Sequence, residues 1–374
     1  RQGTRFCNLK ARVAGVACYD AYLFACLADK TVYALEGSSL ATLATHKEHS
    51  NEPTAIACCS GTCISSDKQG ELVFWRLPKD TSRAVAPARL FSTVQPIRDC
   101  VLCLAAAEGG NVLAIGYQKG CVGLLDVESK ALLHKLTNRR SVQALSWSGA
   151  GHRLICSCQD QSVQVWTFET DFRETPEHAT WLDASTKGDA GDGRSWISAH
   201  ALTEELLLYS GPRGELFLFD AIKKKSTKVP ALHTRPIFCI CPVGTEFVLT
   251  VGMDRYVILW GLNENQLQMK WRLHCLGGHV TSIDTNGSNI LCMSCGDSQV
   301  RIMDLMHREH RQHCWAVFRG LKTPVMAVAR SAAAISGTEI WALGLQDGSL
   351  ALLPVTATDG PGEVDFLSSS SFHK

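Results

Sequence analysis

The sequence lacks a long hydrophobic run, an excess of charge of either sign and a signal-like start. No apolar segment approaches the roughly 18–20 residues that a membrane-spanning helix needs, so we expect no membrane partner. Lysine and arginine total 37 against 36 aspartate and glutamate, and this balance argues against a protein that binds nucleic acid over its whole surface. The start, Arg1-Gln2-Gly3-Thr4, has no initiator Met, from which we expect a fragment or a processed chain.

Familiar catalytic and cofactor motifs are missing as well. The sequence contains no GxSxG, no Walker GxxxxGK[ST] loop, no HExxH and no GxGxxG. Its glycine-rich turns recur at regular intervals, which is typical of hairpin turns rather than of phosphate-binding loops. We therefore predict a protein that is not an enzyme, with no catalytic residues and no cofactor.

Cysteine, by contrast, is abundant, with 17 residues. Without a secretory signal we predict a reducing compartment in which the thiols stay free. Pairs such as Cys156/Cys158 are two residues apart in apolar runs, so both side chains share one face of a strand and are expected to be buried. The CxxC pairs Cys100/Cys103 and Cys292/Cys295 have no partner pair at finger-like spacing, and the His-rich segment 307–313 is expected to be a solvated loop. We predict no metal site.

The chain contains eight copies of one pattern, in which a polar turn is followed by apolar residues two apart and then by a bulky residue. Gln69–Trp75 and Asp254–Trp260 are examples. A period of about 40–50 residues of strand and turn is typical of a β-propeller, and the alternation at period two excludes a helical solenoid. Successive bulky residues are 40, 50, 41, 53, 41, 43 and 50 residues apart, at Leu35, Trp75, Leu125, Trp166, Phe219, Trp260, Met303 and Leu353.

A second apolar run precedes each turn, and the two runs together predict a β-hairpin. With an inner and an outer strand added, each copy makes a four-stranded blade. The copies resemble WD40 repeats, so the predicted fold is all-β, a WD40-type propeller of seven or eight blades. We assign residues 1–355 to it, with the eighth copy either closing the ring or starting a second propeller. Residues 169–194 are expected to be a surface loop, and residues 356–374 a linker or disordered tail.

Candidate binding residues follow from the places where loops of a propeller carry function, namely the segments before the innermost strands and the hairpin turns. Trp196 opens an expected inner strand, Arg235 precedes the strand 237–241, Arg255 lies in a hairpin turn, and His279 precedes the strand 280–283. Each has a structural alternative: Trp196 could pack between blades, Arg255 could pair with an acid, and His279 could be the Gly-His histidine of a WD40 repeat.

Several stretches outside the generic repeat pattern carry a more specific resemblance. They are Leu113–Gly120, His134–Trp147, His233–Phe238, Met253–Arg255, Leu276–His279 and Phe318–Lys322. In these segments the chain resembles the amino-terminal propeller region of the Gemin-five family, the WD40 subunits that recognise small nuclear RNA in the SMN complex. The resemblance runs from about Asp29 to Leu353.

This resemblance implies an RNA-binding subunit that recognises a single-stranded, uridine-rich Sm site, and a 7-methylguanosine cap as a second ligand, for spliceosomal snRNP assembly. Trp196 matches a stacking Trp of that family, and Arg235 and Arg255 match RNA-contacting arginines. His279 stands at the position of a stacking Phe, and Thr281 at that of a Tyr. The other implied partners are SMN-complex proteins, and the implied locations are cytoplasm and nucleus. The alternative hypothesis is a WD40 protein-interaction scaffold without RNA recognition.

Overall fold

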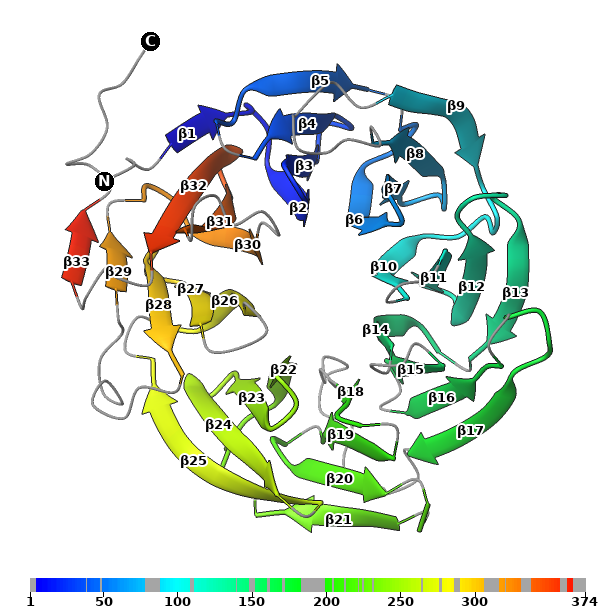
Figure 1. Ribbon diagram of the computed structural model, residues 1–374, viewed down its shortest axis with the longest axis vertical. Helices are drawn as coiled ribbons and strands as arrows, with labels where there is room; N and C mark the ends of the chain where they lie inside the picture. Colours follow the sequence, from blue (N-terminus) through cyan, green and yellow to red (C-terminus); the bar gives the residue numbers. More distant parts are fainter. Residues whose placement is uncertain are drawn as a thin grey trace. The chain divides into compact units, whose positions relative to one another are not determined.

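A computed structural model describes most of the chain. It covers residues 5–365 except 38, 48, 78–87, 108–110, 139, 148–151, 160–161, 170–171, 183–198, 204, 212, 221, 224, 231, 264, 276–277, 286–289, 306–315, 320, 331–337 and 357–361. All the regular structure in this part is strand, arranged in eight sheets (Figure 1). No helix long and apolar enough to cross a membrane occurs in it.

The chain divides into two compact units with four sheets each. Unit 1 comprises residues 1–67, 71–93 and 275–374. Its first two sheets are β2 (Val13–Tyr19), β3 (Tyr22–Leu27), β4 (Val32–Glu36) and β5 (Thr42–His46), then β6 (Pro53–Cys59), β7 (Thr62–Asp67), β8 (Leu72–Arg76) and β9 (Ala88–Val94). The other two contain β26 (Val280–Thr285), β27 (Ile290–Cys295), β28 (Val300–Asp304), β29 (Ala316–Arg319) and β33 (Gly362–Asp365), and β30 (Val325–Arg330), β31 (Thr338–Leu345), β32 (Ser349–Thr356) and β1 (Arg5–Asn8).

Unit 2 comprises residues 68–70 and 94–274. Its first two sheets are β10 (Val101–Ala106), β11 (Val112–Tyr117), β12 (Cys121–Asp126) and β13 (Leu132–Thr137), then β14 (Val142–Trp147), β15 (Arg153–Cys158), β16 (Val163–Thr167) and β17 (Glu177–Leu182). The others are β18 (Ala199–Ala201), β19 (Leu206–Ser210), β20 (Leu216–Asp220) and β21 (Lys225–Val229), then β22 (Ile237–Val243), β23 (Phe247–Gly252), β24 (Tyr256–Asn263) and β25 (Gln266–His274).

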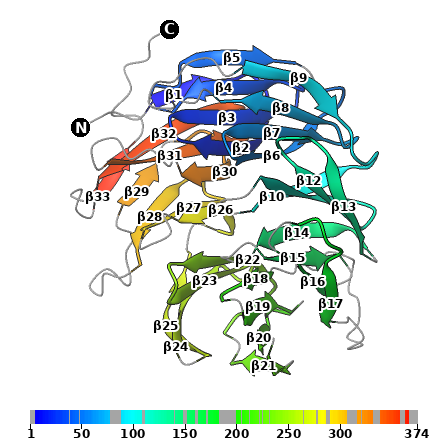
Figure 2. The same cartoon turned by 45° about the vertical axis from the view of Figure 1, so that its right-hand side comes forward.

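Every sheet is an antiparallel meander except where the chain ends join. β1 pairs with β32, so the eighth copy takes its fourth strand from the start of the chain rather than beginning a second propeller (Figure 2). β33 pairs in parallel with β29 and makes that sheet five-stranded. The fold is therefore a β-propeller with eight blades. The sequence left seven or eight blades open, and the structure has eight.

The predicted bulky residues all lie in the third strand of a blade and are buried, from Leu35 at 0% exposed to Trp166 at 9%. The second strands are the apolar runs found before each turn, and β11 is buried along its whole length. The side chains of adjacent sheets pack into shared clusters, in which each fully buried leucine contributes about 1.5–3 kcal/mol. Strand alternation at period two thus supplies two apolar faces for each blade.

Two segments differ from the expectation drawn from the sequence. The insertion 169–194 contains β17, which pairs antiparallel with β16 as the fourth strand of its blade. The segment after residue 355 contains β33. The 16 cysteines in the described structure are all free and none is exposed, as predicted, and burial raises the pKa of most of their thiols, Cys103 to about 12.

Candidate functional site

A buried hydrogen-bond chain holds the loop before β22 against the turn between β23 and β24. The imidazole of His233 lies with Nδ1 3.0 Å from the Asp254 carboxylate and Nε2 2.9 Å from the Thr250 hydroxyl. Trp260 Nε1 donates to the same hydroxyl at 2.9 Å. Burial raises the pKa of the Asp254 carboxyl, but hydrogen bonds from His233 and the amides of Thr234 and Tyr256 outweigh it, so the net pKa lies below its ordinary value.

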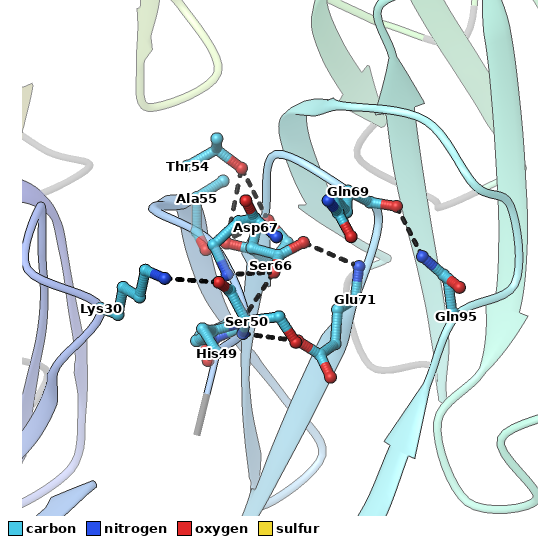
Figure 3. A network of polar contacts seen from close by, with 12 residues as sticks. Lys30, His49, Ser50, Thr54, Ala55, Ser66, Asp67, Gln69, Glu71 and Gln95 are labelled. Atoms are coloured by element: carbon cyan, nitrogen blue, oxygen red, sulfur yellow. Dashed lines mark hydrogen bonds and ion pairs between the residues drawn. The ribbon is translucent and has the colours of Figure 1, made fainter. Parts of the chain in front are cut away.

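A second such chain occurs in the β6–β9 blade, and Figure 3 shows the polar contacts around its His49 and Asp67. His49 Nε2 lies 2.7 Å from the Ser65 hydroxyl, to which Trp75 Nε1 donates at 3.5 Å. The other ring nitrogen of His49, Nδ1, lies 3.7 Å from the Asp67 carboxylate, and the backbone amide of Glu71 donates to that carboxylate at 3.0 Å. The two chains repeat the same His–Ser/Thr–Trp order, so they are one structural device used twice.

One group of metal-type donors exists among the described residues, namely His49, Asp67 and Glu71, with ligand atoms within 4.8 Å of one another. Their oxygens are already used as acceptors: Asp67 takes the amides of Asn51 and Glu71, and Glu71 takes the amide and hydroxyl of Ser50. We assign this group to the support of the loop before β6.

Two of the predicted site residues, Arg235 and Arg255, lie in the loop and the turn that the hydrogen-bond chain at His233 joins. Arg235 lies in the clamped loop, two residues before β22, and is exposed. Arg255 is exposed in the turn that Asp254 anchors, with a φ of 67°, and the neighbouring Met253 amide donates to the Pro236 carbonyl at 2.8 Å. The two arginines therefore project from a turn and a loop that are hydrogen-bonded to each other. Neither arginine forms an ion pair with a described residue.

The other two predicted residues are Trp196 and His279. Trp196 lies outside the described residues. His279 belongs to unit 1, is exposed, and lies against Gly296, whose amide donates to its carbonyl at 2.9 Å. Thr281, two residues further and on β26, shares a hydrogen bond with Ser294 at 2.9 Å.

The same structural positions in unit 2 hold further cations that the sequence analysis did not single out. Arg213 lies in the β19–β20 turn, where a Cβ on Gly214 would be 2.4 Å from the Arg235 carbonyl oxygen. Lys119 lies in the β11–β12 turn, where a Cβ on Gly120 would be 2.7 Å from the Arg140 carbonyl oxygen. In each case the hairpin turn packs against the next inter-strand loop with no room for a side chain at the glycine. The turn and the loop each carry one exposed cation.

These cations have a common electrostatic character. They are exposed, and none forms an ion pair with another described residue; the set is Arg98, Lys119, Arg140, Arg213, Arg235 and Arg255. Other cations do pair, as Arg12 does with Glu52 at 2.7 Å and Arg301 with Asp297 at 2.6 Å. The turns and inter-strand loops of unit 2 therefore carry a set of exposed cations that form no ion pair with a described residue, although the whole chain is nearly neutral. We call this set the basic rim.

Comparison with known proteins bears on this arrangement. The model of the WD domain, G-beta repeat matches residues 270–304, and that of the anaphase-promoting complex subunit 4 WD40 domain matches residues 68–150. The chain is a WD40-repeat β-propeller. Neither matching model describes a catalytic family, and the fold is generally a non-enzymatic scaffold.

Among curated proteins, this WD40 propeller is similar to Gem-associated protein 5 of Homo sapiens, at 22% identity over 83% of the chain and 23% of the relative. The Mus musculus protein of the same name is 22% identical over 71% of the chain and 20% of its own length. The propeller thus spans about a fifth of these relatives. Among solved structures it is similar to Chaetomium thermophilum Sqt1 bound to the N-terminus of ribosomal protein L10, with a TM-score of 0.75, 14% identity, and 92% and 97% of the two chains covered.

Proposed function

We propose that this WD40 propeller is a non-enzymatic RNA-binding protein that recognises single-stranded, uridine-rich small nuclear RNA of the Sm-site type. The observation that carries the proposal is the basic rim of unit 2, in which Arg235 and Arg255 are exposed on a turn and a loop that are hydrogen-bonded to each other, and form no ion pair with a described residue. Unpaired guanidinium groups on exposed loops suit phosphate and base contacts. The distant similarity to Gem-associated protein 5 supports the same ligand class.

The rest of the proposal follows from the matched residues. Trp196 provides a stacking surface for a base, which is worth about 1–3 kcal/mol in single-strand binding. His279 is an exposed ring that can stack on a base or on a methylated cap, whereas Thr281 is engaged with Ser294 and adds no stacking surface. The protein acts with other SMN-complex proteins in cytoplasm and nucleus.

The test measures binding of a short uridine-rich RNA and of a duplex of equal length, at two salt concentrations. We expect the single strand to bind better, and Trp196→Ala to weaken binding by about tenfold or more. Arg235→Gln and Arg255→Gln should weaken binding and lower its salt dependence. Each phosphate contact releases counterions from the RNA, so a variant that makes fewer contacts releases fewer of them.

Lys228→Gln is the matched control, since Lys228 is an exposed cation on β21 of the same unit, outside the basic rim. A cap analogue added as competitor tests cap binding, with His279→Ala as its variant. Equal affinity for strand and duplex, or full binding by a folded Trp196→Ala variant, would instead favour a protein-interaction scaffold.

A further inference from the structure

A pocket of about 450 Å³ opens in the β10–β13 blade, away from Arg235 and Arg255 in the sequence. Three segments line it: the loop before β10, the β11–β12 turn with the start of β12, and the end of β13. The lining residues are Ile97, Arg98, Asp99, Lys119, Gly120, Cys121, Lys135 and Thr137. A liquid water occupies about 30 Å³, so the pocket is far larger than a single small ion requires.

Three of the lining residues are cations: Arg98, Lys119 and Lys135. All three are exposed, and within the described structure none forms an ion pair. The only acid in the lining is Asp99, which is 9% exposed and accepts the amides of Lys119 at 2.7 Å and Cys100 at 2.8 Å. The Asp99 carboxylate offsets one of the three positive charges, so the lining keeps a net excess of positive charge, and its hydrogen bonds to the two amides hold the loop before β10 against the β11–β12 turn.

The wall of the pocket is built in advance of any ligand. Gly120 has a φ of 85°, and a Cβ there would lie 2.7–2.8 Å from the carbonyl oxygens of Arg140 and Asn138. Lys119 is therefore held on a turn that cannot shift toward the next loop. Three like charges fixed around one concavity repel one another, and an anion placed between them relieves that repulsion.

A buried hydroxyl near the pocket also has no partner. The phenol oxygen of Tyr117 makes no hydrogen bond within the described structure, and the residue is 0% exposed. Its ring and the Ile97 side chain both lie against Gly123, each within 4 Å of where a Cβ would stand. Burial and the neighbouring Cys121 and Asp99 raise the pKa of Tyr117, so the hydroxyl stays protonated and can donate.

We propose that this pocket binds the phosphate groups of a nucleotide. Arg98, Lys119 and Lys135 would hold the phosphates, Thr137 would donate a hydrogen bond, and the apolar surface of Ile97 would contact the nucleoside. A nucleotide concentrates several negative charges within one small group, which suits three cations around one pocket better than an acidic peptide with its charges spread along a chain. The source is either a free nucleotide or the phosphorylated 5′ end of an RNA strand. Binding of a free nucleotide does not depend on the proposed RNA function.

The experiment titrates the full chain with uridine 5′-triphosphate, without magnesium, by calorimetry, with uridine as the phosphate-free comparison. We expect the triphosphate to bind and uridine not to. Lys119→Gln/Lys135→Gln should weaken triphosphate binding by about tenfold or more, because hydrogen bonds to charged groups are worth about 1.5–3 kcal/mol each. Lys228→Gln should leave it unchanged.

Oligouridine strands with a 5′-triphosphate or a 5′-hydroxyl separate the two sources. A preference for the triphosphate strand that disappears in Lys119→Gln/Lys135→Gln identifies the source as an RNA end; binding of the free triphosphate alone identifies a free nucleotide. Absence of saturation up to about 1 mM triphosphate, or equal losses in Lys228→Gln and the double variant, would overturn the site. If Trp196→Ala loses oligouridine binding but still binds the triphosphate, the result bears on the proposed RNA function and leaves the nucleotide pocket supported.

Discussion

His200 shows how burial sets the charge of one residue in the β-sheet core. It lies on β18 with Nδ1 2.9 Å from the Ser146 hydroxyl on β14, and burial lowers its pKa from 6.5 to about 4. The unfolded chain therefore binds more protons than the folded chain between these two values. The contribution of a neutral His200 to stability is complete above pH 6.5 and is lost as the pH falls toward 4.

We predict that His200→Asn, which keeps an acceptor near Ser146, removes this pH dependence. The free energy of unfolding of the parent should fall between pH 7 and pH 4.5 by up to about 3 kcal/mol more than that of the variant. Urea unfolding at several pH values measures both slopes. Parallel pH profiles for parent and variant would contradict the assignment.

A second prediction for a single residue concerns the buried hydroxyl of Tyr117, which has no hydrogen-bond partner in the described structure. An unsatisfied buried polar group costs about 1–3 kcal/mol, and Tyr117→Phe removes the group while keeping the ring. We expect the free energy of unfolding to rise by about 1 kcal/mol in the absence of ligand. Tyr209→Phe is the contrast, because its hydroxyl donates to Ser226 at 2.9 Å and its loss should destabilise. A destabilised Tyr117→Phe would mean that the hydroxyl has a partner in solution.

At the residue scale, the sequence analysis did not single out the histidines of the two structural hydrogen-bond chains. The Gly-His pair drew attention to His279, whereas the chains form at His233 and His49, which no glycine precedes. Their signal was spacing: a Ser or Thr 16 or 17 residues after the histidine and a Trp 10 residues after that. Which cations stay unpaired could not be predicted, because pairing depends on acids brought near by folding, as Glu52 is to Arg12.

At the scale of the element, hairpin turns differ in what surrounds their glycines. Gly120 and Gly61 both have positive φ, 85° and 69°. A Cβ on Gly120 would meet two carbonyl oxygens, whereas a Cβ on Gly61 would meet nothing within 4 Å. An alanine at either site would therefore lower stability through its unfavourable positive φ. At Gly120 a steric clash would lower stability further.

We predict that Gly61→Ala lowers the free energy of unfolding by about 1–2 kcal/mol, the cost of a left-handed non-glycine residue. Gly120→Ala should cost at least about 1 kcal/mol more, because the turn must move off the loop that holds Arg140. Denaturant unfolding of the two variants compares them directly. Equal losses would show that the turn and loop do not pack as tightly as described.

The strands themselves were predictable, since period-two alternation and the spaced bulky residues marked the second and third strands of every blade. The outer strands were less so. The sequence predicts a loop where β17 lies, because polar residues such as Glu177 and Thr180 interrupt the apolar alternation that marks the inner strands. The loop positions of Arg235 and Arg255 also followed from pattern, and the same reasoning applied to every blade would have found Arg213 and Arg140.

At the scale of the whole molecule, the fold depends on a strand from the start of the chain. β1 supplies the fourth strand beside β32, whose side chains from Leu350 to Leu353 are buried. Removing residues 1–8 would leave the backbone groups of a core strand without partners. β33 instead extends a sheet that is complete without it.

We predict that deletion of residues 1–8 lowers the melting temperature more than truncation after Thr356, and that it promotes aggregation through the exposed edge of β32. Thermal unfolding followed by circular dichroism, with light scattering in parallel, compares the two. A deletion of residues 1–8 that melts with the parent would show that β1 is dispensable.

The pairing of β1 with β32 and of β33 with β29 has a mechanical consequence. Both end strands lie in unit 1, and each is held by four register pairs. A pulling force applied to the two ends of the chain would load these short ladders first, while the segment 94–274 would carry tension only after unit 1 had yielded. Under tension the molecule should therefore open by peeling from its end strands, and the turns that carry Arg235 and Arg255 would be the last to lose their geometry.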